Sequence, residues 1–291
     1  MINEPGIYKI SAEEYHADPC EKPSLSRSTI KQILADCPAR VWWNNPRLNP
    51  AFVDDDGGGK FDVGEAAHSL FLEGVDKICI VDEKDWKKKS AQEERGLARL
   101  QGVVPLLPHQ TENVLAMVAA AHKALATWEE FSIKNLHTQG ESELSYIWEE
   151  KGTWCRVRPD WISKNRKLII DYKTTGMSAN PAEWARQVVN MGYDIQHSFY
   201  RRGVKAIEGE APQFRFMVQE VKAPYLCSFI GLPPEFAAMG KEKTEYGIYL
   251  WNQCLATGIW EGYPTKTCFL DPPAYALSNW EQKAQTIGEV Q

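Results

Sequence analysis

Between residues 141 and 230, short apolar runs rich in β-branched and aromatic residues alternate with turn residues. Runs such as ESELSYIWEE, TWCRVRPDWI and LIIDYKTT have the length and composition of strands, and KG and SKNRK are typical turns between them. The pattern predicts strands at 141–150, 153–162, 168–175, 213–221 and 225–230. The first three are expected to form a meander, with a hairpin closed by SKNRK.

Helical periodicity lies on both sides of these strands. Apolar residues three and four apart predict helices at 24–36, 61–74, 111–130, 180–202 and 234–257. Ser26 or Ser28 is the expected cap of the first helix. Asn180, followed by Pro181 and Glu183, predicts a start like a capping box for the fourth. Core positions of the helix at 111–130 are expected at Val114, Met117, Val118 and Leu125.

Two polar segments separate these elements. DDDGGGK at 54–60 predicts a loop, and the highly charged segment 84–100 predicts a solvated helix or a mobile loop. The chain shows no internal repeat. The order of helix, strands, helix, strand and helix predicts a mixed α/β (α+β) fold, with a central mixed sheet flanked by helices.

Composition places the chain among soluble proteins. Its 291 residues are 43% hydrophobic, enough for one large core or two modest ones. No apolar run approaches the roughly 20 residues of a membrane helix, and the N-terminus lacks the pattern of a signal peptide. We therefore expect a cytoplasmic protein without a membrane partner.

The seven cysteines form no CxxC pair, so neither a zinc site nor a disulfide framework is expected. Cys254 and Cys268 are the only hint of an iron–sulfur cluster, and reduced thiols are the better interpretation. The net charge of −6 argues mildly against a nucleic-acid partner but does not exclude one, because a basic groove can coexist with an acidic exterior.

The strand LIIDYKTT raises a chemical question, because it carries two charges in an otherwise apolar run. Alternation places Ile169, Asp171 and Lys173 on one face, and the opposite face is also apolar. Charges in such a strand are costly unless they are paired or bind a metal. One interpretation is a structural ion pair at the strand end.

The other interpretation is catalytic. The predicted hairpin places Asp160 beside Asp171, and two neighbouring carboxylates repel unless a cation lies between them. Oxygen ligands suit Mg²⁺, with Mn²⁺ as a substitute. Lys173 projects from the same face as Asp171, where it is able to orient or deprotonate a water molecule. This set of groups suits metal-dependent hydrolysis of a phosphodiester.

These residues carry a resemblance to a known family. The PD at 159–160 and the DYK at 171–173 resemble the PD-(D/E)xK nuclease signature. GYDIQHSFYRRG, with Gln196 and Tyr200, is similar to a helix motif of these enzymes, and VGEAAHSLFLEG resembles the helix that carries the histidine of RecE-type exonucleases, here His68. From about Ser24 to the end, the chain resembles a RecE/exonuclease VIII-like nuclease of phage or prophage type.

The resemblance implies a single nuclease domain over 1–291, with a restriction-endonuclease-like core. Its parts would be an N-terminal helical part (1–60), the PD-(D/E)xK core (61–265) and a C-terminal tail (266–291). It also implies a metal site made by His68, Asp160, Asp171 and the backbone carbonyl of Tyr172, with Lys173 as a catalytic residue.

The resemblance further implies the activity and partners. It implies 5′→3′ digestion of linear double-stranded DNA, a ring-shaped homo-oligomer (trimer or tetramer) and a single-strand annealing partner of RecT type. The residues expected to contact DNA are Gln196, Tyr200, Arg158, Arg156 and Arg27, with Arg40, Trp86 and Lys87 as further candidates. Arg156 and Arg158 are equally able to neutralise the acidic cluster. Glu65 is expected to be a solvent, ion-pair or supporting residue.

Two alternative functions remain. One is a different hydrolase, either a PD-(D/E)xK endonuclease or a Cas4-like or RecB-like nuclease. The other is an inactive module that binds DNA or supports assembly, although the presence of Asp160, Asp171 and Lys173 argues against it.

Overall fold

The computed structural model describes residues 1–52, 62–74, 78–131 and 133–288, so the loop predicted at 54–60 lies outside the described residues. The chain forms two compact units, Met1–Trp260 and Glu261–Gln291. The second unit contains one helix, α11 (Ala274–Gly288). The predicted subdivision at residues 60 and 265 stays a prediction.

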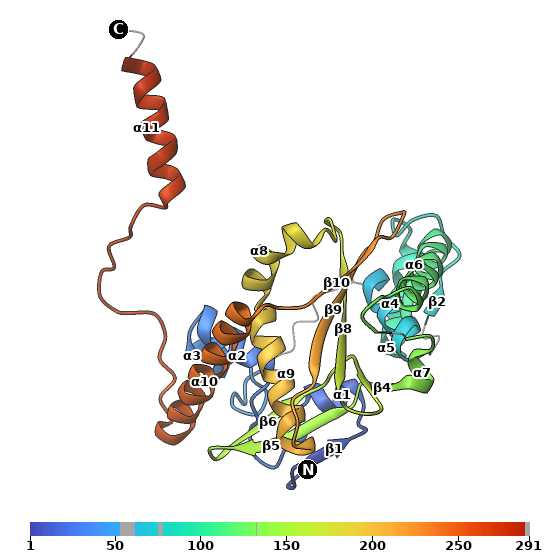
Figure 1. Ribbon diagram of the computed structural model, residues 1–291, viewed down its shortest axis with the longest axis horizontal. Helices are drawn as coiled ribbons and strands as arrows, with labels where there is room; N and C mark the ends of the chain where they lie inside the picture. Colours follow the sequence, from blue (N-terminus) through green and yellow to red (C-terminus); the bar gives the residue numbers. More distant parts are fainter. Residues whose placement is uncertain (53–61, 75–77, 132, 289–291) are drawn as a thin grey trace. The chain divides into compact units, whose positions relative to one another are not determined.

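The first unit contains both helices and short strands (Figure 1). The strands are β1 (Gly6–Tyr8), β2 (Ile78–Ile80), β3 (Val104–Leu106), β4 (Gly140–Ser142), β5 (Ser145–Glu150), β6 (Thr153–Val157), β7 (Trp161–Ser163), β8 (Leu168–Thr175), β9 (Gln213–Glu220) and β10 (Cys227–Ile230). The helices are α1 (Ala12–His16), α2 (Arg27–Ala35), α3 (Pro38–Trp43), α4 (Asp62–Leu72), α5 (Lys89–Leu100), α6 (Pro108–Ala126), α7 (Leu136–Gln139), α8 (Pro181–Met191), α9 (Tyr193–Glu208) and α10 (Pro234–Thr257).

A five-stranded mixed sheet of order β10-β9-β8-β7-β4 forms the centre of this unit. Strands β8 and β9 are parallel, and the other pairs are antiparallel. Helices α8, α9 and α10 lie on one side of the sheet, and α4 and α6 lie on the other (Figure 1). The predicted fold class, a mixed sheet flanked by helices, is confirmed.

Strand β8 is buried on both faces, as its apolar pattern predicts. Ile169 packs in the core cluster on the side of α9, whereas Leu168, Ile170 and Tyr172 pack in the cluster formed with α4 and α6. Asp171 shares the parity of Ile169 and has no exposed surface. The strand therefore holds an acidic side chain inside the protein.

The predicted strand at 153–162 is wrong as a single element. It forms two strands: β6 belongs to a three-stranded sheet of order β1-β5-β6, and β7 belongs to the five-stranded sheet. Pro159 lies at the break, where its missing N–H would leave a gap in a ladder. The predicted strand at 141–150 is divided in the same way into β4 and β5, with Glu143 at the break in a left-handed conformation (φ 59°).

The chain thus crosses between the two sheets twice, and the crossings are joined. The backbone N–H of Glu143 donates to the carbonyl oxygen of Asp160 at 3.2 Å. Each crossing carries an acidic residue at the point where it leaves the ladder. This contact brings two carboxylates to one edge of the central sheet.

The predicted helix at 180–202 is also divided. Asn180 caps α8, as predicted, because its side-chain oxygen accepts the N–H of Ala182 at 3.1 Å. The backbone N–H of Glu183 donates to the backbone carbonyl of Asn180 and not to its side chain. Gly192 ends α8 and begins α9 with φ 64°, in a region that glycine adopts without strain. The change of direction aims α9 at β8.

Several other predictions agree with the structure. Ser26 caps α2 by accepting the N–H of Thr29, and the charged segment 84–100 contains the helix α5. The helix predicted at 111–130 is α6, which buries Val114, Met117 and Leu125 and half-buries Val118. In the described parts of the chain, no helix is both long and apolar enough to cross a membrane.

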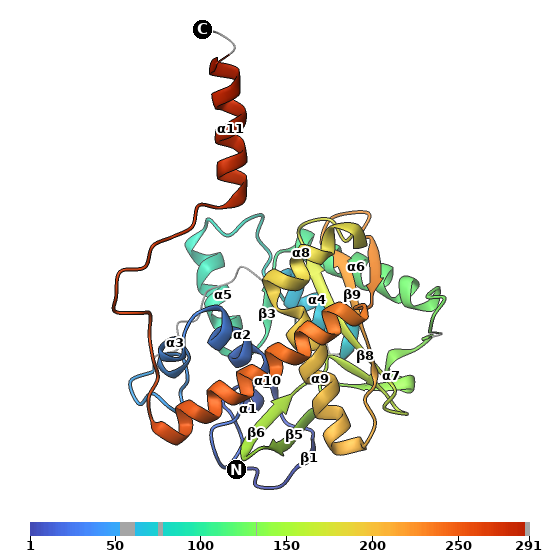
Figure 2. The same ribbon diagram turned by 60° about the vertical axis from the view of Figure 1, so that its left-hand side comes forward.

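Close helix packing leads to a first prediction. Helix α10 lies against α2 and α9 (Figure 2), and a Cβ added at Gly240 would lie 2.1 Å from the backbone oxygen of Asp194 in α9. We expect Gly240→Ala to lower the free energy of unfolding by about 1–3 kcal/mol or more, because α10 must shift away from α9. Thermal unfolding measures the effect.

Gly96→Ala is the matched control, because no atom lies within 4 Å of the added Cβ on exposed α5. There the better helix propensity of alanine should stabilise by about 0.5–1 kcal/mol. A Gly240→Ala protein that unfolds at the wild-type temperature would contradict the packing.

Candidate active site and metal centre

Asp160 and Asp171 come from neighbouring antiparallel strands. The register pairs Trp161 with Ile170 and Ile162 with Ile169, so the next pair along the ladder is Asp160 and Asp171. One Asp160 carboxylate oxygen accepts the backbone N–H of Tyr172 at 2.8 Å. The two acidic residues therefore lie side by side, as the sequence predicts.

His68, on helix α4, also contacts Asp160. Its Nε2 lies 3.3 Å from Asp160 Oδ2, and its Nδ1 lies 3.9 Å from Glu143 Oε1. Helix α4 reaches this position because it approaches β8 closely: a Cβ at Gly64 would lie 2.8 Å from Thr174 Oγ1. Gly64 thus supports the placement of His68 one turn further along the helix.

Glu143 is the acidic residue of the site that the sequence analysis missed. His68, Glu143 and Asp160 each offer one ligand atom, and these three atoms lie within 4.8 Å of one another. Arg158 pairs with the Glu143 carboxylate. No clear signal for this residue exists in the sequence, because the division of the predicted strand 141–150 at Glu143 appears only in the structure.

Asp171 and Lys173 form a second, deeper pair. Lys173 Nζ contacts Asp171 Oδ1, and Gln196 Nε2 donates to Asp171 Oδ2. Gln196 therefore reaches the site from α9, where its partner is an acidic residue, and its contact with DNA stays a prediction. The Tyr172 ring points to the opposite face, where it packs on Phe71, and its backbone carbonyl as a metal ligand stays a prediction.

Burial, together with repulsion between the carboxylates, perturbs the protonation of the site. Burial and the charge of Asp160 raise the pKa of Glu143 to about 7 and that of Asp171 to about 6. Burial opposes a charge on His68, but the Asp160 and Glu143 carboxylates raise its pKa to about 9. Despite its burial, Asp160 has a lowered pKa because His68 and Lys173 are beside it.

These perturbations indicate that the cluster fits a divalent cation. A cation among the three donor atoms would replace the protons that Glu143 and His68 otherwise retain. Carboxylate oxygens with one imidazole suit Mg²⁺ and Mn²⁺. His68, Glu143 and Asp160 are the residues that would hold it, with Asp171 adjacent.

Arg27 and Tyr200 lie at the edge of this site. Arg27 Nη2 donates to the Met191 carbonyl at 2.5 Å, and its charge offsets a small part of the rise that burial and Asp160 cause in the pKa of Asp171. Tyr200 lies one turn beyond Gln196; burial, followed by the charges of Tyr15, Asp171 and Asp160, raises its pKa well above the usual range. Their contacts with DNA stay predictions.

Arg156 and Arg158 have structural partners. Arg156 is 7% exposed and pairs with Asp18 at 3.1 Å, so it fastens the N-terminal segment, and its contact with DNA stays a prediction. Arg158, paired with Glu143, neutralises the acidic cluster, which is one of the two roles expected for it.

The further candidates are dispersed. Arg40 pairs with Asp36 at 3.1 Å, and Lys87 lies 3.8 Å from Asp85. Glu65 and Trp86 line a cavity that also borders His68.

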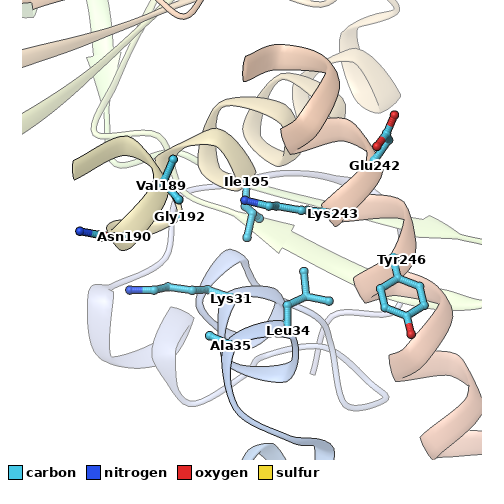
Figure 3. Close-up of a pocket in the computed structure, with 10 residues that line it drawn as sticks. All are labelled: Lys31, Leu34, Ala35, Val189, Asn190, Gly192, Ile195, Glu242, Lys243 and Tyr246. Carbon is cyan, nitrogen blue, oxygen red and sulfur yellow. The ribbon is translucent and has the colours of Figure 1, made fainter. Parts of the chain in front are cut away.

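A separate hollow of about 440 Å³ lies between α2, α10 and the joint of α8 and α9. Figure 3 shows Lys31 and Leu34 of α2 on one side, and Lys243 and Tyr246 of α10 on another. None of the residues of the metal centre lines it.

All seven cysteines, each in the described part of the chain, are thiols without a disulfide.

The sheet, the paired acidic residues and the adjacent lysine define a restriction-endonuclease-like PD-(D/E)xK fold. Comparison with known families agrees: the model of a PDDEXK-like domain of unknown function (DUF3799) matches residues 26–269. The match covers more than half of the chain, so the chain belongs to this family. The predicted membership of the PD-(D/E)xK nuclease superfamily is confirmed.

A solved structure has a similar fold. A candidate exonuclease from Eubacterium rectale is similar with a TM-score of 0.61 and 17% identity, over 91% of this chain and 96% of that one. An alkaline exonuclease from Laribacter hongkongensis is only distantly similar, with 14% identity and a TM-score of 0.24 over 66% of this chain and 99% of that one. No curated protein matches the chain significantly.

The raised pKa values lead to a prediction for metal binding. His68 and Glu143 must lose protons to become ligands, so Mn²⁺ binding should release protons at pH 7 and strengthen by roughly tenfold per pH unit for each proton released. Isothermal titration calorimetry in buffers of different ionisation enthalpy counts these protons. Glu143→Gln should weaken binding by roughly tenfold or more and reduce the count.

Binding that is independent of pH between 6 and 9 would contradict this site. Asp36→Asn is a suitable control, because Asp36 pairs with Arg40 outside the donor group and its loss should leave the titration unchanged.

The same groups determine how the metal-free protein responds to pH. A pKa raised in the folded state gives stability that is present below the unfolded pKa and lost as pH rises through the folded one. For His68 this window runs from 6.5 to about 9, so the unfolding temperature in EDTA should fall across it. In His68→Gln the fall should largely disappear; an unchanged slope would show that other groups cause it.

Proposed function

We propose that this chain is a Mg²⁺-dependent exodeoxyribonuclease that digests linear double-stranded DNA. The observation that carries the proposal is the convergence of Asp160, Asp171 and Lys173 beside His68 and Glu143. A divalent cation bound at such a site would lower the pKa of a bound water molecule and neutralise charge on the phosphate.

The chain's own residues have distinct roles in this reaction. Asp160, Glu143 and His68 present ligand atoms toward one point, and Asp171 sits behind them with Gln196 fixing its orientation. Burial opposes the charge on Lys173, but Asp171 and Asp160 raise its pKa, so it is an ammonium group in this arrangement. It therefore acts as a donor that orients the attacking water or a phosphate oxygen.

The direction and products of digestion extend the proposal. We infer 5′→3′ polarity and release of 3′ single-stranded tails for strand annealing, in a homo-oligomeric ring (trimer or tetramer) with an annealing partner of RecT type. These features rest on the resemblance to RecE-type nucleases, and the name of the Eubacterium rectale protein is consistent with an exonuclease. A ring would let an acidic exterior coexist with a basic passage.

The direct test compares wild type with Lys173→Ala on linear 5′-phosphorylated duplex and on covalently closed circular DNA, each with Mg²⁺. We expect wild type to degrade only the linear DNA and Lys173→Ala to lose at least roughly a hundredfold in rate, because donors to the developing oxyanion typically contribute that much. Gel electrophoresis and release of acid-soluble nucleotide measure both.

Lys164→Ala is the control lysine variant, because its side chain is exposed in the turn between β7 and β8, outside the metal centre. Cutting of the circle would favour the endonuclease alternative. Equal, negligible digestion by wild type and Lys173→Ala would leave a DNA-binding role.

A further inference from the structure

A cavity of about 920 Å³ opens beside the metal centre on the side of His68. Helix α4 contributes Gly64, Glu65 and His68 to its wall, and the end of β8 contributes Thr174. Side-chain amides of α6, which are able to bond base edges or phosphate oxygens, also line it. Because His68 belongs to both, the cavity begins at the metal centre.

Trp86 is the aromatic residue of this wall, and its position is unusual. It lies in the segment KDWKKK, where every neighbour is charged, yet it is half-buried and borders the cavity. The guanidinium carbon of Arg95 lies 4.7 Å from the centre of its ring, a cation–π contact. The backbone carbonyl of Trp86 accepts the Gln92 side-chain amide at 2.9 Å.

The arginine over the ring is itself fixed. Arg95 Nη2 lies 2.8 Å from Asp62 Oδ2, and Arg99 Nη2 lies 3.0 Å from the same oxygen. Asp62 begins α4, the helix that carries His68. The indole is thus connected through Arg95 and Asp62 to the helix of the metal centre, and its ring is held in place before any ligand binds.

The size and chemistry of this cavity select its ligand. A duplex, whose grooves alone are roughly 6 and 12 Å wide, is too large to enter. A nucleotide fits, since small-molecule sites enclose roughly 300–1,000 Å³. The Asp62 carboxylate is already paired with two arginines, and an aromatic face beside cations and amides is the combination that binds unpaired bases.

We propose that Trp86 is a stacking platform for an unpaired base of the DNA strand that enters the metal centre. This inference rests on the proposed nuclease function and adds a subsite to it. The strand end must then separate from its complement before hydrolysis. Stacking on Trp86 offsets part of the cost of that separation, so Trp86 acts on the binding of substrate.

The test uses Lys173→Ala protein without divalent metal, so that the DNA stays intact. Short single-stranded oligonucleotides carry the fluorescent base 2-aminopurine at one of the first four positions. We expect quenching at one or two positions, retained in Trp86→Phe and lost in Trp86→Leu, with affinity lowered roughly 5- to 100-fold by the leucine. Trp43→Ala, an exposed tryptophan outside this cavity, is the control.

Hydrolysis by the otherwise wild-type protein separates this proposal from the proposed function. Trp86→Leu should raise the KM for linear duplex with little change in kcat, and Trp86→Phe should restore it. Equal quenching with and without the Trp86→Leu substitution, in proteins that unfold at the same temperature, would overturn the subsite, even if DNA is digested. Quenching that depends on Trp86 without any digestion would uphold the base site and reject the nuclease.

Discussion

The backbone hydrogen bond from Glu143 to Asp160 is the contact on which the rest of the site depends. It joins the two points where the chain passes between the central sheet and the three-stranded sheet. Each passage leaves an acidic side chain outside a regular ladder, and the bond holds these side chains together. Carboxylates in such proximity are costly, so the surrounding residues must compensate for their charge.

The compensation is distributed among several elements. Arg158 neutralises Glu143, His68 approaches Asp160 from α4, and Lys173 pairs with Asp171 inside the sheet. Helix α4, which carries His68, approaches β8 closely, which explains the glycine at position 64. A divalent cation would remove the remaining repulsion, so the electrostatic cost of the metal-free site and the chemistry proposed for it have the same origin.

Local pattern predicted the part of this site that depends on strand alternation. Asp171 and Lys173 share a face because residues two apart do so in any strand, and Asp160 follows from the hairpin.

Glu143 was missed because ESELSYIWEE has the pattern of one uninterrupted strand, and only the crossing to a second sheet divides it. The turn at Gly192 was missed for a related reason: the apolar periodicity continues through it, and the glycine's conformation depends on where α9 must point. In one continuous strand, Arg156 would point to the same face as Asp160. The break at Pro159 instead leaves Arg156 in β6, whose sheet differs from that of β7, the strand that follows Asp160.

The N-terminal residues, whose order the sequence did not reveal, form part of this architecture. Strand β1 covers the outer edge of β5, and Asp18 supplies the partner for the buried guanidinium of Arg156. A shortened chain that begins at Ser24 would expose a bare strand edge, which invites pairing between molecules, and would leave a cation enclosed without its counter-ion. The opening two dozen residues are therefore an unsuitable place for trimming, although a terminus on the surface would ordinarily be the first choice for it.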